Sequence, residues 1–262
     1  PKIAALLAEK DEKEARRILS AYYSIYIKEE VQAEALTRNL AAFQRFLPVV
    51  AQANAQMIEY QNIARECSVP ASTVKEYFSI LEDTLIGFFL WPWGRNERKK
   101  ARPKFYFFDN GVLRSIQRRT GEAATKEEMG FLFETWFVNE VRRILHYRES
   151  DIEPCLWREG HHEIDLCLEK NGKLLCAFEI KTGKNFSADP SMKAFRARFP
   201  DIPLFIVAKD LPAPRMLDHG VRAVSPENAI RYLRQELCPA LFPRIQTKLP
   251  RKRRTEITET PG

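Results

Sequence analysis

Residues 163–181, with the sequence EIDLCLEKNGKLLCAFEIK, decide the fold of this chain. Two apolar-rich runs flank the turn signal Lys170-Asn171-Gly172, and this pattern predicts a β-hairpin. Side chains alternate across a strand, so the apolar faces of the two runs match only if the numbers of paired residues add up to an even value. A two-residue Asn-Gly loop gives an odd sum, so we expect a three-residue loop with Gly172 in the left-handed position. This register places Asp165 diagonal to Glu179 on one face of the sheet.

The polar face of the expected hairpin carries Asp165, Glu179 and Lys181, while Ile164 and Leu166 lie on the apolar face. Two neighbouring carboxylates raise each other's pKa unless a cation lies between them. Such oxygen ligands suit Mg²⁺ or Mn²⁺, and a lysine on the same face can orient or activate a metal-bound water. Asp165 followed by Glu179-Ile180-Lys181 resembles the core of PD-(D/E)xK nucleases, in which a hairpin presents the metal site. The alternative is an exposed sheet face with ordinary charged residues.

A third carboxylate, Glu134, lies within residues 130–145, which are a strong candidate for a helix. Its neighbours at helical spacing are apolar, so Glu134 interrupts an apolar stripe and needs a basic partner or a metal ion. The first core helix of PD-(D/E)xK enzymes carries a glutamate in this role. The resemblance therefore implies a catalytic set in which Asp165 and Glu179 hold the metal and Glu134 holds it through water or a second ion. Lys181 would position the attacking water. The alternative is an ion pair between Glu134 and an arginine such as Arg158.

The sequence pattern of residues 58–109 predicts a winged helix. A short helix that ends at Cys67 is broken by Ser68-Val69-Pro70, and a second helix follows as far as residue 84. Two short helices with this tight turn are typical of a helix-turn-helix motif. Two β-rich runs, residues 86–93 and 103–109, then form the wing.

The candidates for nucleic-acid binding lie on the wing tip and on the second helix. A basic wing suits phosphate contacts, which give affinity without sequence information. Glu76, Glu82 and Asp83 on the second helix would instead repel phosphates. Winged helices also serve in protein interactions or in packing within a chain, and that is the alternative here. The candidate residues are Ser72, Thr73, Lys75, Arg95, Arg98, Lys99, Lys100 and Arg102.

The composition is that of a globular protein, for which we expect a cytoplasmic location. With 262 residues, 45% of them hydrophobic, the chain is long enough for one large domain or two ordinary ones. No apolar run approaches the ~18–20 residues of a membrane span, and the first residues are charged too soon for a signal peptide. The five cysteines form no C-x-x-C pair, and the four histidines lack ligand spacing. The net charge of +7 is compatible with nucleic-acid binding.

Successive sequence blocks resemble one family over roughly residues 15–210. The family is a domain of unknown function that forms the C-terminal half of many prokaryotic AAA-type ATP-binding proteins. The resemblance implies a winged helix joined to a PD-(D/E)xK-like domain, with a P-loop ATPase domain upstream. The chain contains no G-x-x-x-x-G-K-[ST] motif and begins with Pro1, so we expect a fragment in which ATP acts only through a missing upstream domain. The blocks include YIKEEV (26–31), TVKEYFSILEDT (73–84), PKFYFFDNG (103–111), WR (157–158), EID (163–165) and FEIK (178–181).

We therefore expect an α+β protein: a mainly helical winged-helix part followed by an α/β restriction-endonuclease-like domain. The expected function is that of a Mg²⁺-dependent DNA endonuclease, with DNA and an ATPase as partners and no contact with a membrane. One alternative is a non-catalytic DNA- or protein-binding module that regulates an ATPase, with Lys181 paired to Glu179 in a structural charge cluster. Another is a transcription factor that uses the wing alone, and the oligomeric state stays open. The expected boundaries are 1–50 for the N-terminal helices, 51–120 for the winged helix-turn-helix, 125–245 for the nuclease-like domain and 246–262 for a flexible basic tail.

Overall fold

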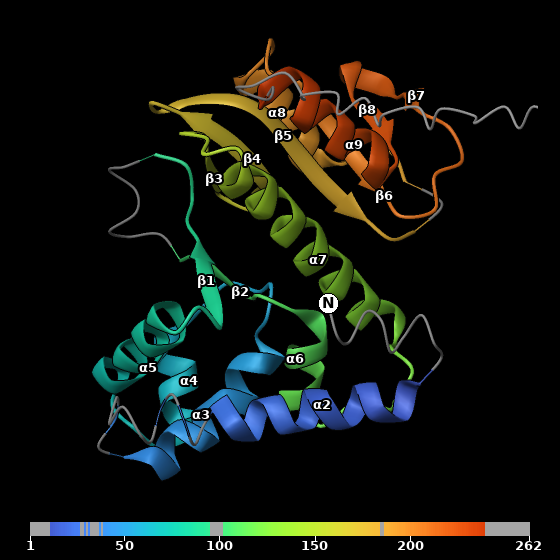
Figure 1. Ribbon diagram of the computed structural model, residues 1–262. Coiled ribbons are helices and arrows are strands. Elements are labelled where there is room, and N and C mark those ends of the chain that lie inside the picture. The colour runs from blue at the N-terminus through green and yellow to red at the C-terminus, as the bar shows by residue number, and fades with distance from the viewer. Residues whose placement is uncertain are drawn as a thin grey trace, which may run out of the picture.

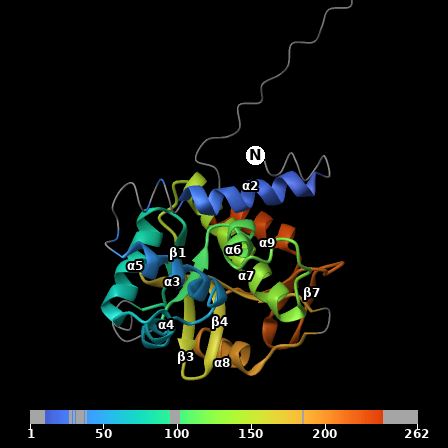
Figure 2. The same ribbon diagram turned by 90° about the horizontal axis from the view of Figure 1, so that it is seen from below.

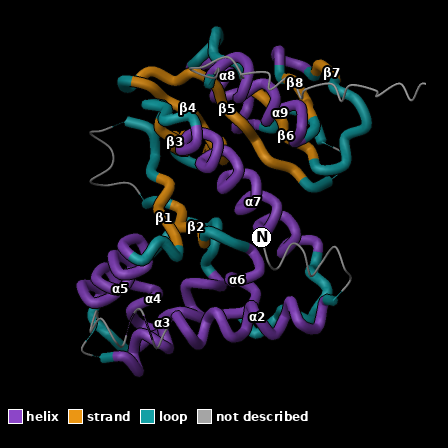
Figure 3. Tube along the Cα trace, viewed as in Figure 1, coloured by secondary structure: helices purple, strands orange, loops and turns teal. Residues whose placement is uncertain are grey.

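The computed structural model describes residues 11–26, 29, 31, 37, 39–94, 102–183 and 186–238. Helices fill one half of the molecule, and a mixed sheet with its covering helices fills the other (Figures 1 and 3). The expected α+β class is confirmed. No helix in the described ranges is long and apolar enough to cross a membrane. The wing-tip residues Arg95, Arg98, Lys99 and Lys100 and the predicted tail 246–262 lie outside the described residues.

The helical region is built around one apolar core. Aromatic rings hold its helices together, and those of Phe46 and Phe78 meet nearly at right angles with centroids 5.1 Å apart. Pro70 directly precedes a helix, as predicted, because its fixed φ suits a helix start. The first described helix of this region (Glu12–Ile25) packs across its last helix (Asn110–Ile116), as the view from below shows (Figure 2). Among the described residues, its helices are α2 (Glu12–Ile25), α3 (Leu40–Gln52), α4 (Tyr60–Cys67), α5 (Ala71–Asp83) and α6 (Asn110–Ile116).

A two-stranded hairpin, β1 (Gly87–Leu90) and β2 (Lys104–Phe107), lies between the two halves (Figure 1). All four residues of β2 are buried. Because side chains alternate, Phe105 and Phe107 enter the helical core while Tyr106 enters the core of the other half. Lys104 lies on the same face as Tyr106. One strand therefore belongs to both cores and carries a lysine into the α/β half.

The main sheet has six strands in the order β3-β4-β5-β6-β8-β7. Strands β3, β4 and β5 are antiparallel, whereas β6 runs parallel to β5 and to β8. Helices α7 and α9 cover one face, and α8 covers the other. The strands are β3 (Glu153–Glu159), β4 (His162–Lys170), β5 (Lys173–Lys181), β6 (Leu204–Ala208), β7 (Arg215–Met216) and β8 (Arg222–Val224). The helices are α7 (Lys126–Tyr147), α8 (Pro190–Arg198) and α9 (Pro226–Tyr232).

The turn of the β4–β5 hairpin differs from the prediction. Lys170 pairs with Lys173, so the loop is the two-residue Asn171-Gly172 turn, and both of its residues have positive φ. Beside this turn, the numbers of two paired residues add up to an odd value. Beyond a register shift, where Leu175 is an extra residue on β5, they add up to an even value. The predicted even register is therefore correct, but a β-bulge produces it and the predicted three-residue loop is wrong.

A second bulge changes where Asp165 points. Cys155 pairs with Cys167 and Trp157 with Ile164, so Asp165 and Leu166 together oppose the single residue Leu156. Ile164 joins the core under α8, whereas Leu166 joins the core under α7. The prediction that Ile164 and Leu166 share one face is thus wrong, because the bulge interrupts the alternation. The carboxylate of Asp165, which lies in this bulge, bonds to Lys104 of β2 and to the backbone N–H of Ile180 of β5.

Candidate functional site

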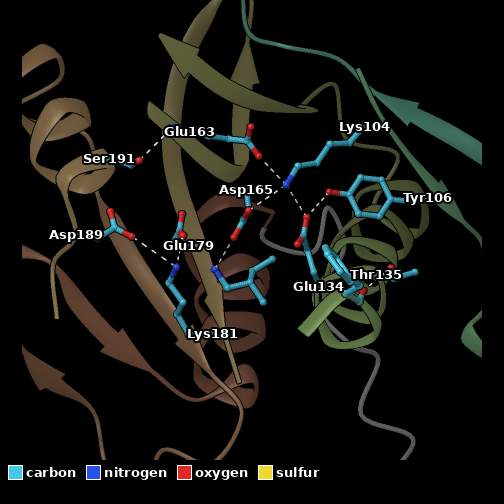
Figure 4. A network of polar contacts seen from close by, with 12 residues as sticks. Lys104, Tyr106, Glu134, Thr135, Glu163, Asp165, Glu179, Lys181, Asp189 and Ser191 are labelled. Atoms are coloured by element: carbon cyan, nitrogen blue, oxygen red, sulfur yellow. Dashed lines mark hydrogen bonds and ion pairs between the residues drawn. The ribbon is translucent and has the colours of Figure 1, made fainter. Parts of the chain in front are cut away.

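Lys104 lies at the centre of three carboxylates (Figure 4). Its Nζ is 2.8 Å from Glu134 Oε1, 2.7 Å from Glu163 Oε1 and 3.1 Å from Asp165 Oδ1. The side chain of Lys104 is only 7% exposed, and that of Glu134 is 11% exposed. We call Lys104, Tyr106, Glu134, Glu163 and Asp165 the Lys104 cluster. It joins the strand β2 to the helix α7 and the strand β4.

Two carboxylates of the Lys104 cluster are held by hydrogen bonds that do not involve lysine. The hydroxyl of Tyr106 donates to Glu134 Oε1 at 2.6 Å. The backbone N–H of Ile180 donates to Asp165 Oδ2 at 3.0 Å, which leaves Oδ1 for Lys104. Glu163 is the most exposed of the three acidic residues, and its backbone N–H donates to Ser191 Oγ at 3.2 Å. The cluster is therefore a fixed arrangement supported by β2, β5 and α8.

Burial and charge act in opposite directions on the two buried groups at the centre. Burial, reinforced by the charge of Asp165, raises the pKa of Glu134 to about 7, although the bonds from Lys104 and Tyr106 oppose the shift. Burial by itself would lower the pKa of Lys104. The electrostatic effects of Tyr106, Asp165, Glu134 and Glu163 outweigh it and raise that pKa well above its ordinary value of 10.5. Lys104 is therefore a permanent cation in this site.

A second cluster forms on the other face of the sheet. Lys181 Nζ is 2.7 Å from Glu179 Oε1 and 3.5 Å from Asp189 Oδ2, where Asp189 caps α8. Glu179 Oε2 is buried and has no hydrogen-bond partner among the described residues. Burial, followed by the charge of Asp165, raises the pKa of Glu179 to about 8. The pKa of Lys181 rises to about 12, because Glu179, Asp165 and Asp189 outweigh its own burial.

The structure thus divides the predicted catalytic set into two pairs. Glu134 and Asp165 share Lys104, whereas Glu179 is paired with Lys181. Within the described ranges, no hydrogen bond or ion pair links Glu179 or Lys181 to Lys104 or Glu134. The carboxylate of Asp165 contacts Lys104, whereas that of Glu179 contacts Lys181, so among the described residues no single lysine is bonded to both.

Sequence reasoning missed Lys104, Tyr106 and Glu163. The available signal was a lysine at the start of KFYFF, an otherwise apolar and aromatic run, because a buried lysine requires anionic partners. The expectation that Glu134 needs a cation is confirmed, but the suggested partner Arg158 is wrong. Arg158 Nε donates instead to the carbonyl of Gly160 at 3.5 Å.

The implied metal ion does not fit the residues as they are arranged here. The position where carboxylate oxygens converge is filled by the Lys104 ammonium. Within the described residues, no three His, Cys, Asp or Glu side chains have the geometry of a metal site. Glu179 Oε2, which is buried and has no hydrogen-bond partner among the described residues, belongs to the separate pair with Lys181.

The predicted nucleic-acid contacts are only partly described. Ser72 and Lys75 are exposed on α5, and Thr73 is partly exposed. The ammonium of Lys75 lies over the ring of Tyr60 at 5.4 Å from its centroid. Arg102, two residues before β2, forms an ion pair with Glu59. The other predicted wing-tip positions lie outside the described residues.

Comparisons with known proteins give two domain matches and two relatives. Residues 4–123 match a domain of unknown function (DUF8612), and residues 129–221 match another domain of unknown function (DUF4143). The second domain is commonly found with AAA-type ATPases. Uncharacterized protein Rv2008c of Mycobacterium tuberculosis and uncharacterized protein Mb2031c of Mycobacterium bovis are each 24% identical over 178 residues. The alignment covers 66% of this chain and 39% of each relative. No solved structure matches the chain.

The raised pKa values predict how stability depends on pH. Glu134 and Glu179 have ordinary values of 4.5, which apply to the unfolded chain, and folded values of about 7 and about 8. The folded state therefore binds more protons between these limits, so its stability is greatest at low pH and falls as pH rises toward about 8. We expect the unfolding free energy to fall on the order of a few kcal/mol between about pH 5 and about pH 9.

Thermal or urea unfolding across this range measures the slope. Glu179→Gln should flatten it, because the amide cannot titrate, and the exposed Glu76→Gln should leave it unchanged. Stability that rises with pH in the wild type, or an unchanged slope in Glu179→Gln, would contradict the assignment.

Proposed function

We propose that this chain is a non-catalytic binding module that regulates an AAA-type ATPase. The observation that carries the proposal is the place of Lys104. The ammonium of a residue from the wing strand β2 neutralises the carboxylates that a PD-(D/E)xK nuclease would use for its metal. Lys181 is paired with Glu179 at 2.7 Å, the contact expected of a structural charge cluster. In this function the cluster fastens the helical region to the α/β region.

Other buried polar contacts across the same joint support a fastening role. Asn54, at the end of α3, donates to Thr135 Oγ1 of α7 at 2.7 Å and accepts from the N–H of Phe107 at 3.0 Å. Asn139 of α7 donates to the carbonyl of Phe107 at 2.9 Å. Asn54 and Thr135 are fully or almost fully buried. Since buried polar groups are costly unless paired, these bonds favour one relative position of the two regions.

The hairpin gives the winged helix a role in packing within the chain. Phe88, Leu90 and Tyr106 face the α/β core, while Phe105 and Phe107 face the helical core. A strand buried on both faces offers no free surface to DNA. The exposed part of α5, with Ser72 and Lys75, is the surface that we assign to partner contacts.

The ATPase partner is inferred from the comparisons. The domain matched by residues 129–221 is commonly found with AAA-type ATPases. The chain spans about two-fifths of the length of the curated relatives that it matches. A module that fixes two regions rigidly together suits the transmission of a conformational change from an ATPase to a bound partner.

The second candidate function is a DNA nuclease that uses Mg²⁺ or Mn²⁺. The order of α7, the β4–β5 hairpin and α8 is compatible with a PD-(D/E)xK-like layout that presents Glu134, Asp165, Glu179 and Lys181. The observation that favours it is the buried and unpartnered Glu179 Oε2, because an unsatisfied carboxylate oxygen near other carboxylates is typical of a ligand site. The Lys104 ammonium argues against this function in the present arrangement.

Calorimetry with Mn²⁺, run beside a plasmid-nicking assay, tests the choice. We expect the wild type to show no saturable Mn²⁺ binding at micromolar concentrations and no nicking. Asp165→Ala should show the same two results and a lower unfolding temperature, because it removes a buried partner of Lys104. Micromolar binding by the wild type that Asp165→Ala abolishes, with nicking lost in parallel, would establish the nuclease instead.

A further inference from the structure

We infer that a cavity between α7 and α9, at the carboxyl ends of β6 and β8, binds an arginine side chain of a partner protein. The cavity has a volume of about 480 Å³, and residues from α6, α7, α9 and the segment after β6 line it. None of its lining residues belongs to the Lys104 cluster, so the inference goes beyond the proposed function and does not depend on it.

The parallel part of the sheet sets the place of the cavity. β6 runs parallel to both β5 and β8. Lys209 and Asp210 directly follow β6, and Glu227 lies three residues beyond the end of β8. The crevice beyond the carboxyl ends of parallel strands is where open α/β sheets bind their ligands. The cavity therefore lies where this kind of sheet offers a binding site.

An aromatic pair on α7 forms the opposite wall. Trp136 and Phe133 both line the cavity, and their rings are stacked with centroids 5.7 Å apart and planes 14° apart. Phe133 is buried, whereas Trp136 is 37% exposed. The stack fixes the orientation of the indole and leaves part of it open to solvent. An exposed indole attracts cations, and a guanidinium group stacks flat on such a ring.

The polar groups of the cavity wall include three acceptor side chains. Asn110 Oδ1 is buried without a hydrogen-bond partner among the described residues, while Nδ2 of the same amide donates to the carbonyl of Leu132 at 2.8 Å. A hydrogen bond with Ser225 lowers the pKa of Glu227, so this carboxylate is ionised at neutral pH. Asp210 is exposed and supplies the second carboxylate. Such a wall favours a ligand that is rich in N–H donors.

The charges of the lining residues favour a cation. Lys209 contributes one ammonium, which contacts Met129 Sδ at 3.7 Å and forms no ion pair within the described part of the chain. The carboxylates of Asp210 and Glu227 outnumber this ammonium, so one negative charge is left for a ligand to compensate.

An arginine in a peptide matches each of these groups. Its guanidinium is planar, stacks on aromatic rings and carries five N–H donors, which suit two carboxylates and an amide oxygen. The carbonyl of the peptide bond beside the arginine can accept from Lys209. A lysine ligand would bring three donors and no planar face. The volume of the cavity lies within the range of about 300–1,000 Å³ that is typical of ligand sites.

Titration with acetyl-Gly-Arg-Gly-amide, followed by NMR, tests the inference. We expect saturable binding that shifts the indole N–H signal of Trp136, which Trp136→Phe identifies among the signals of the four tryptophans. The matched peptide carries citrulline, which has the shape of arginine without its charge. It should bind at least about tenfold more weakly, because charged hydrogen bonds are the stronger ones.

Variants of the lining residues identify the site. Asp210→Asn/Glu227→Gln and Trp136→Ala should each weaken binding of the arginine peptide at least about tenfold. Asp201→Asn is the control, because Asp201 is exposed and lies outside the cavity, and it should bind as the wild type does within about twofold. Unfolding temperatures measured beside the titrations show that the variants are folded.

Three results would overturn the inference and leave the proposed function intact. The first is the absence of saturable binding up to about 10 mM peptide. The second is equal affinity for the arginine and citrulline peptides. The third is an unchanged affinity in the folded Asp210→Asn/Glu227→Gln variant.

The chain itself contains another source of arginine, residues 251–254 (RKRR), which lie outside the described residues. Truncation after Thr247 separates this source from a partner. An affinity for the arginine peptide that stays within about twofold would support the partner. A gain of about tenfold or more on truncation would show that the chain's own basic segment occupies the cavity, and it would overturn the assignment to a partner.

Discussion

Lys104→Met is expected to lower the unfolding free energy by about 3–5 kcal/mol in metal-free buffer near neutral pH. The substitution leaves the buried Glu134 and the partly buried Asp165 and Glu163 together without Lys104. Removing one partner from a buried ion pair costs more than the pair contributes, because the remaining charge has lost its hydration. Urea denaturation followed by circular dichroism measures the effect.

Charge compensation provides the control for this prediction. Lys104→Met/Glu134→Gln removes one positive and one negative charge, so it should recover a large part of the lost stability. The exposed Lys209→Met should change stability by less than about 0.5 kcal/mol. An equal loss in the single and double variants would show that packing of the lysine stem, and not charge, stabilises this joint.

Arg196→Met is expected to lower the unfolding free energy by about 2–4 kcal/mol. The guanidinium of Arg196, on α8, donates to the backbone carbonyls of Phe199, Pro200, Ile202, His219 and Gly220 at distances from 2.8 to 3.5 Å. It thereby ties the loop before β6 to the turn before β8. Several carbonyl oxygens would lose their donor at once, and lysine cannot replace a planar fork of donors.

The same helix supplies a matched control. Arg198 is exposed and contacts the ring of Phe199 with its guanidinium carbon 5.6 Å from the centroid. Arg198→Met should therefore cost less than about 1 kcal/mol. Arg196→Lys should lose most of the stability that Arg196→Met loses. Equal effects of the Arg196 and Arg198 substitutions in urea unfolding would contradict the role given to the Arg196 hydrogen bonds.

Local patterns in the sequence predicted most of the elements. The apolar stripe around Glu134 predicted α7, and the break at Ser68-Val69-Pro70 predicted the boundary between α4 and α5. The turn signal Asn171-Gly172 predicted the β4–β5 hairpin. These predictions succeed because helix period, turn residues and strand alternation are properties of neighbouring residues.

The two bulges explain where the predictions failed. The extra residue Leu175 produces an even pairing sum that the turn by itself does not give. The bulge at Asp165 and Leu166 places Ile164 and Leu166 on opposite faces of the sheet. A bulge leaves no distinct sequence signal, because it is stabilised by the packing of both sheet faces against α7 and α8. The predicted place of Asp165 near Glu179 rested on ideal alternation, whereas the structure bonds the carboxylate of Asp165 to Lys104 and to the N–H of Ile180.

By itself, the sequence determined that Glu134 is buried and needs a cation, and that Glu179 and Lys181 lie on one face of a strand. The tertiary structure alone decided which cation each carboxylate receives. Lys104 is 30 positions from Glu134 and 61 positions from Asp165, so no local pattern reports their contact. The reason is that β2 is buried between two cores, and its alternation sends Phe105 and Phe107 to one core and Lys104 to the other. A buried ammonium must lie where anions converge, and the packing of β2 against α7 brings it to that place.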